Sequence, residues 1–162
     1  MDKSSLATAL DIMAVNQTKG SQTHEHTYLV LDCVALLHKL AWLKSGTFGD
    51  IIRQYESYRH VTIVFDGYLT PSAKDMEHKS RVKQPSVAAH FQDKGYSVIY
   101  VHADADTLIV KTALNIVKER HITIVADNTD ILVLLLYHCC KNISMQSATH
   151  SGHICDIQTI QK

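Results

Sequence analysis

From Thr27 onward, short apolar runs alternate with longer amphipathic segments. The short runs are rich in Val and Ile and apolar on both faces, which is typical of strands buried within a parallel sheet. Strands are expected at Tyr28–Asp32, His60–Phe65, Ser97–Val101, His121–Val125 and Ile143–Met145. The pattern therefore predicts an α/β domain, a three-layer arrangement in which helices cover both faces of a mostly parallel central sheet.

The segments between these strands carry apolar residues at helical spacing, and several begin with residues that can cap a helix. Thr47 and Ser86 are such residues. Helices are expected at Val34–Leu43, from Thr47 to about Tyr58, at Ser72–Lys83, from Ser86 to Lys94, from about Asp104 to Arg120 and at Ile131–Cys139, with a turn at Asp127–Asp130 and a last hairpin turned by Ser151 and Gly152.

The first 26 residues differ from the rest, because Ser, Thr, Gln and Asn occur throughout them. We expect residues 1–26 to be a polar N-terminal tail or a loosely docked segment, and we assign them no function. Residues 27–162 are expected to form one domain, since a chain of this size suits a single core.

The charged residues, the cysteines and the apolar runs limit which partners and which cellular compartment are expected for the protein. Lys plus Arg and Asp plus Glu number 16 each, so any surface that binds a polyanion must be local. The four cysteines lie in or beside apolar runs, which indicates reduced thiols in an intracellular protein of the nucleus or cytoplasm. The most apolar run, Ile131–Tyr137, is far shorter than the roughly 20 residues that cross a bilayer, so no membrane association is expected.

Aspartates stand at the end of successive predicted strands. They are Asp32, Asp66, Asp104, Asp106, Asp127 and Asp130. The carboxyl ends of parallel strands meet at one edge of a sheet, and ligands bind at that edge, so we expect these acids to lie together. Each acid taken alone has an ordinary explanation, since Asp is common in turns and at helix N-termini.

Two details favour a shared site. Asp32 and Asp66 end apolar strands directly, where a buried carboxylate is costly unless a cation or a hydrogen-bond donor compensates it. Asp106 and Asp130 are expected to point toward the sheet, because each shares a helical face with apolar residues. Those residues are Ile109, Val110, Ala113 and Val117 for Asp106, and Val133, Leu134 and Tyr137 for Asp130.

Clustered carboxylates repel one another and are stable mainly with a hard cation bound. Oxygen ligands alone favour Mg²⁺ or Mn²⁺ over zinc. Two such ions roughly 3.5 to 4 Å apart can activate a water molecule and stabilise the leaving oxygen of a phosphodiester. The acids therefore indicate a site for metal-dependent hydrolysis.

Other chemistries fit less well. A zinc site is disfavoured, because the cysteines near His138, His150 and His153 show no Cys-x-x-Cys pair. A phosphatase of the haloacid-dehalogenase type needs an Asp two residues after Asp32, where Val34 stands. The chain also lacks the glycine-rich phosphate loop of P-loop enzymes.

Read in order, the acidic motifs resemble those of flap endonucleases and PIN-like nucleases. The matching segments are Leu-Val-Leu-Asp32, Val-Phe-Asp66-Gly67-Tyr, Ala-Asp104-Ala-Asp106-Thr and Ala-Asp127-Asn-Thr-Asp130. The resemblance covers about Tyr28 to Lys162 and is closest to uncharacterised animal proteins, often associated with mobile elements, that carry this domain. It implies a sheet of order 3-2-1-4-5 and metal-dependent cleavage of nucleic acid, with DNA more expected than RNA.

The resemblance also implies roles for the acids. By motif position, the catalytic carboxylates that hold a first metal ion are Asp32, Asp66, Asp104 and Asp106. Asp130 falls on a catalytic carboxylate that holds a second ion. Asn128 stands where the family has another second-ion carboxylate, and its carbonyl oxygen or Asp127 can supply an oxygen ligand there.

Basic residues follow the second strand. Lys74 and Arg81 share one face of the predicted helix, with Lys83 to its side. In flap endonucleases the corresponding helix brings basic residues to the scissile phosphate, so the resemblance implies that these three bind substrate. The alternative is a solvated basic face paired with Asp75 and Glu77.

The chain departs from flap endonucleases in two ways. Fewer residues separate Asp66 from Asp104 than their arch requires, and the chain ends before their helical DNA-binding segment and last carboxylate. We expect an incomplete member of the family. Two functions stay open: a Mg²⁺- or Mn²⁺-dependent nuclease, and a catalytically weak or inactive remnant that binds nucleic acid or protein. The sequence indicates no particular protein partner.

Overall fold

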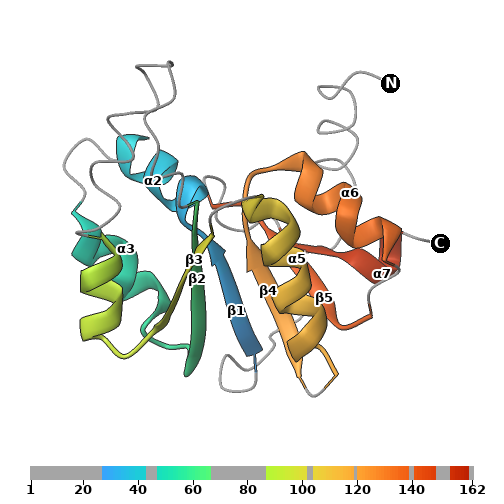
Figure 1. Cartoon of the computed structure of the whole chain (residues 1–162), viewed down its shortest axis with the longest axis horizontal. Helices are drawn as coiled ribbons and strands as arrows, with labels where there is room; N and C mark the ends of the chain where they lie inside the picture. The colour runs from blue at the N-terminus through green and yellow to red at the C-terminus, as the bar shows by residue number, and fades with distance from the viewer. Residues whose placement is uncertain are drawn as a thin grey trace.

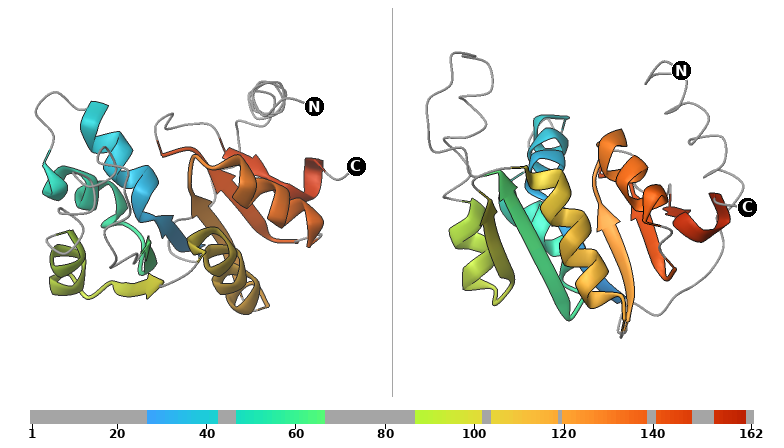
Figure 2. Two further views of the ribbon diagram at one scale, coloured as in Figure 1. Left: turned by 45° about the horizontal axis from the view of Figure 1, so that its top comes forward. Right: turned by 45° about the vertical axis from the view of Figure 1, so that its right-hand side comes forward.

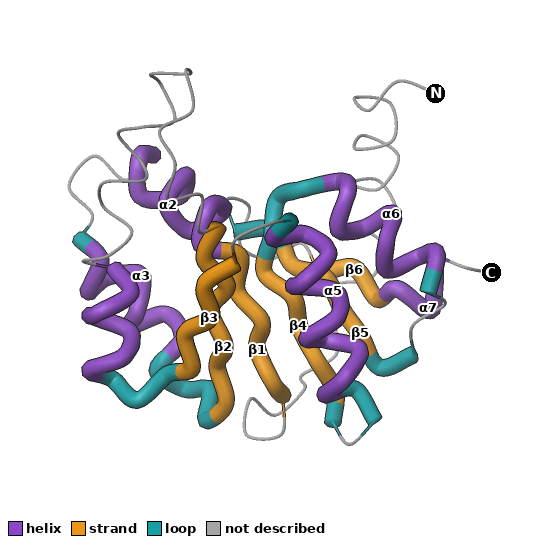
Figure 3. Tube along the Cα trace, in the orientation of Figure 1, coloured by secondary structure: helices purple, strands orange, loops and turns teal. Residues whose placement is uncertain are grey.

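A mostly parallel sheet forms the centre of the molecule (Figure 3). The computed structural model describes residues 27–42, 47–66, 87–101, 104–118, 120–138, 141–148 and 154–160. Within them lies a six-stranded sheet of order β3-β2-β1-β4-β5-β6. The strands are β1 (Thr27–Asp32), β2 (His60–Asp66), β3 (Ser97–Val101), β4 (His121–Val125), β5 (Ile143–Gln146) and β6 (Ile154–Asp156). Neighbouring strands are parallel except β5 and β6, which are antiparallel.

Helices connect the strands and cover both faces of the sheet (Figures 1 and 2). They are α2 (Cys33–Trp42), α3 (Phe48–Tyr55), α5 (Ala105–Ile116), α6 (Thr129–Tyr137) and the short α7 (Ile157–Ile160), and residues 87–93 are also helical. In the right-hand view of Figure 2, α5 crosses in front of the central strands. No helix among the described residues is both long and apolar enough to cross a membrane.

Alternate strand residues divide the core into two layers. Leu29 and Leu31 of β1 belong to the layer that packs against α2, α3 and residues 87–93, whereas Val30 belongs to the layer under α5, α6 and α7. The same alternation separates Phe65 from Val64 in β2. Both faces are buried because successive side chains of a strand point to opposite sides. Each fully buried Leu, Ile or Phe stabilises the fold by about 1.5 to 3 kcal/mol relative to an exposed one.

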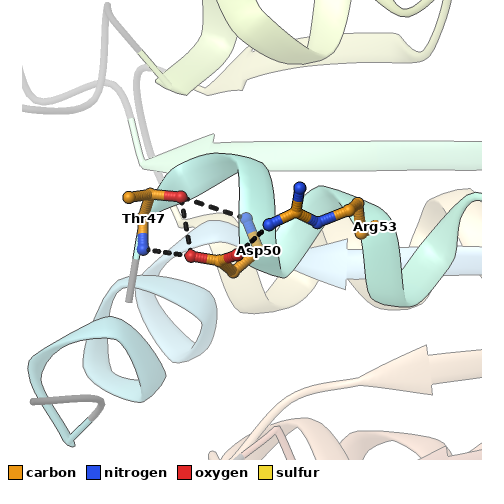
Figure 4. Close-up of polar contacts among 3 residues, drawn as sticks. All are labelled: Thr47, Asp50 and Arg53. Carbon is orange, nitrogen blue, oxygen red and sulfur yellow. Dashed lines mark hydrogen bonds and ion pairs between the residues drawn. The ribbon is translucent and has the colours of Figure 1, made fainter. Parts of the chain in front are cut away.

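The start of α3 shows how local sequence defines an element (Figure 4). The Thr47 hydroxyl accepts a hydrogen bond from the Asp50 backbone N–H at 3.3 Å, and the Asp50 carboxylate accepts one from the Thr47 N–H at 2.7 Å. Arg53 forms an ion pair with Asp50 one turn later. This capping box satisfies backbone donors that the first turn leaves unpaired.

The structure confirms the predicted α/β class and the strand order 3-2-1-4-5. At one edge β6 pairs antiparallel with β5, in keeping with the expected last hairpin, whose turn residues lie outside the described ones. Several helices begin or end at other residues than predicted. The helix that starts after Thr47 ends at Tyr55 rather than near Tyr58, and α5 ends at Ile116 rather than near Arg120. α6 begins at Thr129, so it includes the last two residues of the turn predicted at Asp127–Asp130. The helix predicted at Ser72–Lys83 lies outside the described residues.

Two of the cysteines lie in described segments. Cys33 and Cys155 are both free thiols and both buried. Their burial is what their positions in or beside apolar runs lead one to expect.

Candidate functional site at the carboxyl edge of the sheet

The backbone brings the predicted acids to one edge of the sheet. β1 and β2 run parallel and end at Asp32 and Asp66, so both side chains leave the sheet at its carboxyl edge. The helices α5 and α6 start just after β3 and β4, so their N-termini lie at the same edge, which is the upper one in Figure 1. Asp104 is the N-cap of α5, and Asn128 is the N-cap of α6.

Asp32 is the most buried of these acids, with 8% of its surface exposed. Its Oδ1 accepts a hydrogen bond from the Val34 N–H at 2.9 Å, in the first turn of α2. The pKa of Asp32 is raised from 3.8 to about 6, chiefly by burial and also by the charges of Asp106 and Asp127, against the lowering effect of backbone N–H groups. A nearby cation would offset this cost and favour the ionised carboxylate.

Asp106 is the electrostatic centre of the cluster. Its half-buried carboxylate has a raised pKa, chiefly because of burial and then because of the charges of Asp104, Asp130 and Asp66. It also contributes to the raised pKa of Asp32. A hydrogen bond from Asn128 acts in the opposite direction. Every other predicted catalytic acid therefore interacts with Asp106.

Asp66 and Asp104 approach Asp106 from different elements. Asp66 ends β2, and its Oδ1 atom is buried. Asp104 is exposed and caps α5, where its carboxylate accepts hydrogen bonds from the Asp106 N–H at 3.2 Å and from the Thr107 hydroxyl. Asp104 thus has a structural role in addition to any role as a ligand.

Asn128 and Asp127 were each expected to offer an oxygen ligand to a second metal ion. Both form hydrogen bonds within the protein. Asn128 Oδ1 accepts from the Asp130 N–H at 2.9 Å, and Asn128 Nδ2 donates to Asp106 Oδ2 at 2.6 Å. The exposed Asp127 accepts through Oδ1 from the Ser147 hydroxyl at 2.5 Å and from the Ala148 N–H at 3.0 Å. Asp127 therefore links the end of β4 to the segment after β5. Nothing in the sequence indicated Ser147, because its position beside Asp127 depends on the β4–β5 pairing.

The predicted orientation of Asp130 is wrong. The side chains that α6 buries are Ile131, Leu132 and Leu135, whereas Val133 is 48% exposed and Tyr137 is 80% exposed. Asp130 is itself exposed, in the first turn of α6. The error arose because α6 is apolar on nearly every side, so helical spacing did not identify a unique buried face. For Asp106 the expected face is right, since α5 buries Ile109, Val110 and Ala113.

The chemistry of these side chains fits a hard divalent cation better than zinc, because every candidate donor is an oxygen atom. Their spacing is more open than a closed ligand shell. In the segments that the structure describes, no three His, Cys, Asp or Glu side chains are grouped in a way that could hold a metal ion. Lys74, Arg81 and Lys83 lie outside the described residues, so their substrate-binding role stays a prediction.

Comparison with known proteins gives matches at the level of structure. No protein-family model matches the chain, and no curated protein does. Solved structures do match. A mutant of the T5 5′-exonuclease aligns with a TM-score of 0.57 at 14% identity, over 82% of this chain and 54% of that one. A flap endonuclease of bacteriophage T5, in a complex with DNA and metal ions, aligns with a TM-score of 0.57 at 11% identity, over 80% of this chain and 57% of its own.

The catalytic core of Rad2 in complex with a DNA substrate aligns with a TM-score of 0.55 at 16% identity, over 92% of this chain and 52% of that one. The chain thus spans about half the length of the solved structures that it matches. At these identities the likeness shows the fold, which is the PIN-like fold of flap endonucleases and 5′-exonucleases. None of these structures bears on the resemblance to mobile-element-associated proteins, which stays a prediction.

Proposed function

We propose that this chain is a divalent-metal-dependent nuclease that hydrolyses phosphodiester bonds, with DNA as the expected substrate and Mg²⁺ or Mn²⁺ as its cofactor. One observation carries the proposal: carboxylates from β1, β2, α5 and α6 interact with the partly buried Asp106 at the carboxyl edge of the sheet. The shared fold supports it, since the solved structures with this fold include complexes with DNA and with metal ions.

In this proposal Asp32, Asp66 and Asp106 hold the cation, and Asp104 and Asp130 contribute from the N-termini of α5 and α6. A bound divalent cation would supply an activated water molecule and stabilise the leaving oxygen. Asp32 and Asp66 are suited to hold an ion in a fixed position, because strand ends anchor them. The N-terminal dipoles of α5 and α6 partly offset the negative charge of the acids.

The wider assignments also stay proposals. Residues 27–162 would make up the nuclease domain, with residues 1–26 as a polar tail. Lys74, Arg81 and Lys83 would contact the substrate phosphates. The buried free thiols of Cys33 and Cys155 are in keeping with a reducing compartment, the cytoplasm or the nucleus.

Cleavage assays test the proposal directly. Flapped DNA, single-stranded DNA and single-stranded RNA would be incubated with the chain and Mn²⁺. Asp32→Asn should lower cleavage by more than about 100-fold, because even residues that only orient a ligand contribute about 10- to 100-fold. The control is Asp93→Asn, which removes the same charge from an exposed position just before Gly95 and β3, at the opposite edge of the sheet. Equal cleavage by the parent and Asp32→Asn would contradict the proposal.

A second function is favoured by a different observation. Asp106 already receives a hydrogen bond from Asn128, and the described acids do not form a closed metal-binding group. This arrangement also suits a catalytically inactive remnant that binds nucleic acid or protein. Fluorescence anisotropy distinguishes the two: DNA binding that is equal in EDTA and in Mn²⁺, without cleavage in either, would favour the remnant.

A further inference from the structure

The outer side of α6 is apolar and exposed. Val133 is 48% exposed and Tyr137 is 80% exposed, one helical turn apart, and the half-buried Leu134 and Leu136 flank them. We call these four residues the α6 face. The ring of Tyr137 meets that of His138 edge-on, with ring centroids 5.3 Å apart, and still remains largely exposed. Helix faces that stay in water normally carry polar side chains, so the α6 face is suited to be covered.

The extent of the α6 face favours a partner that is tethered to the domain. An interface between separate chains buries at least roughly 500 Å² on each partner. A completely buried Tyr contributes only roughly 150 to 250 Å², and Leu134 and Leu136 are already half-buried, so the α6 face falls short of that area. A segment of the same chain needs less contact, because a short tether gives it an effective concentration on the order of millimolar.

An apolar stripe in the first 26 residues of the chain matches this requirement. These residues lie outside the described ones, but their sequence places Leu6, Leu10 and Met13 at positions i, i+4 and i+7, on one side of a helix. Thr8 and Asp11 fall on the opposite side of that helix. A helix this short is marginal in isolation, so its apolar side needs a surface to pack against.

The linker between the stripe and the domain is long enough to reach α6. Residues 14–26 separate Met13 from Thr27, the first residue of β1, and from position 16 on they are all polar or Gly. Thirteen residues span roughly 20 Å on average and up to about 45 Å when extended. β4 pairs with β1, and α6 follows β4 and leads back toward the edge of the sheet where Thr27 lies. The outer side of a helix lies only about 10 to 12 Å farther out than its inner side.

From these observations we infer that the α6 face is the docking surface for Leu6–Met13 of the same chain, packed against it as a helix. Leu6, Leu10 and Met13 would cover Val133 and Tyr137, so that α6 is held from its outer side as well as from the sheet. The inference goes beyond the proposed nuclease activity and does not depend on it.

Hydrogen–deuterium exchange of the full chain, measured by mass spectrometry, tests the inference. In the parent, the amides of residues 6–13 should exchange about tenfold more slowly than in a synthetic peptide of residues 1–26, as expected of a segment that is docked about nine-tenths of the time. Val133→Ser combined with Tyr137→Ser should abolish this protection. The double variant should fold, because both side chains lie outside the core, and its melting curve checks this.

A reciprocal pair and two matched controls complete the series. Leu10→Ser combined with Met13→Ser should also abolish the protection, and this pair lies outside the folded domain that the structure describes. Ile12→Ser removes an apolar side chain of the same segment that falls outside the stripe. Tyr100→Ser removes a 47% exposed aromatic ring from β3, at the far edge of the sheet from β6. Both controls should keep the protection of the parent.

Several results would overturn the inference. Amides of residues 6–13 that exchange in the parent as fast as in the peptide would show that the segment is not docked. Protection that survives Val133→Ser with Tyr137→Ser, or that is lost in Tyr100→Ser, would place the segment elsewhere. Protection that increases with protein concentration, together with a dimer mass in light scattering, would assign the α6 face to a second copy of the chain.

Discussion

Asp32 shows how the fold changes the chemistry of one residue. In the sequence it is the last residue of an apolar run, and in the structure it is 8% exposed, beside the charges of Asp106 and Asp127. Burial comes first among the causes that raise its pKa to about 6. The carboxylate therefore destabilises the metal-free protein near neutral pH, and this cost is what a bound cation would remove.

The first prediction follows from the sign of that shift. In the folded protein the pKa of Asp32 lies above 3.8, the ordinary value for an aspartate. The folded state therefore binds this proton more tightly than the unfolded state does. The stability from this residue is present in full below pH 3.8 and is lost as the pH rises through about 6. At about 1.4 kcal/mol per pKa unit, the loss is at most about 3 kcal/mol. Urea unfolding in EDTA between pH 4 and 8 measures it.

Asp32→Asn should flatten this pH dependence and raise the free energy of unfolding at pH 7. The Asn side chain can still accept the hydrogen bond from Val34, so packing is preserved. Asp93→Asn, at an exposed position, should keep the slope of the parent. If Asp32→Asn retains the parental slope, Asp32 is not the group that titrates.

Helix N-termini position part of the candidate site, alongside the strand ends that carry Asp32 and Asp66. α5 and α6 begin with the caps Asp104 and Asn128, and each carries an acid, Asp106 or Asp130, in its first turn. A cap residue holds the chain in the extended conformation before the helix, so it also determines where the first turn points. Capping and ligand placement are therefore coupled at this edge of the sheet.

Asp104→Asn tests that coupling. Asn caps a helix about as well as Asp, so the melting temperature in EDTA should stay the same or rise slightly as a charge beside Asp106 is removed. If Asp104 also binds the cation, the Mn²⁺ concentration that gives half of the thermal shift should increase about tenfold. An unaltered Mn²⁺ response would assign Asp104 to capping alone.

The capping box of α3 serves as a contrast, because α3 belongs to the opposite helical layer. Thr47→Ala removes the hydroxyl that accepts from the Asp50 N–H and should cost about 1 kcal/mol, or roughly 2 to 4 °C in melting temperature. Thr47→Ser keeps the acceptor and should restore most of this loss. Neither variant should alter Mn²⁺ affinity, and a large change in that affinity would show that α3 influences the site.

The whole molecule presents several repelling carboxylates at one edge of a well-packed sheet. A ligand that binds only the folded state stabilises it by mass action. At a Mn²⁺ concentration of 100 times the Kd, this amounts to about 2.7 kcal/mol, or roughly 5 to 10 °C for a domain of this size. Thermal melting across a Mn²⁺ titration measures the rise, and Asp106→Asn should blunt it. A melting curve that does not respond to Mn²⁺ would count against a formed site.

The overall charge of the molecule also limits the proposed DNA binding. Because the basic and acidic residues balance, any attraction to DNA must come from a local surface. Lys74→Ala combined with Arg81→Ala should weaken DNA binding and reduce its salt dependence by up to about two phosphate contacts. The matched control is Lys118→Ala with Arg120→Ala, two exposed positions before β4, at the opposite edge of the sheet. Equal losses of affinity in both double variants would show that any basic pair contributes.

The sequence by itself determined the class of the fold and the edge at which the acids meet. Runs such as Leu29–Leu31 are apolar on both faces, and only a sheet covered on both sides can bury them. With parallel strands, Asp32 and Asp66 then had to leave the sheet at the same edge. These conclusions depend on local patterns, which the sequence states directly.

Only the tertiary structure decided how the acids relate to one another. It made Asp106 the centre of the cluster, turned Asn128 toward it, and drew Asp127 toward Ser147. It also left Asp130 exposed, against the prediction from helical spacing. Each of these facts depends on contacts between residues far apart in the chain and on the rotation of α6. A helix that is apolar on nearly every side takes its rotation from the surface it packs against, and the sequence pattern does not contain that information.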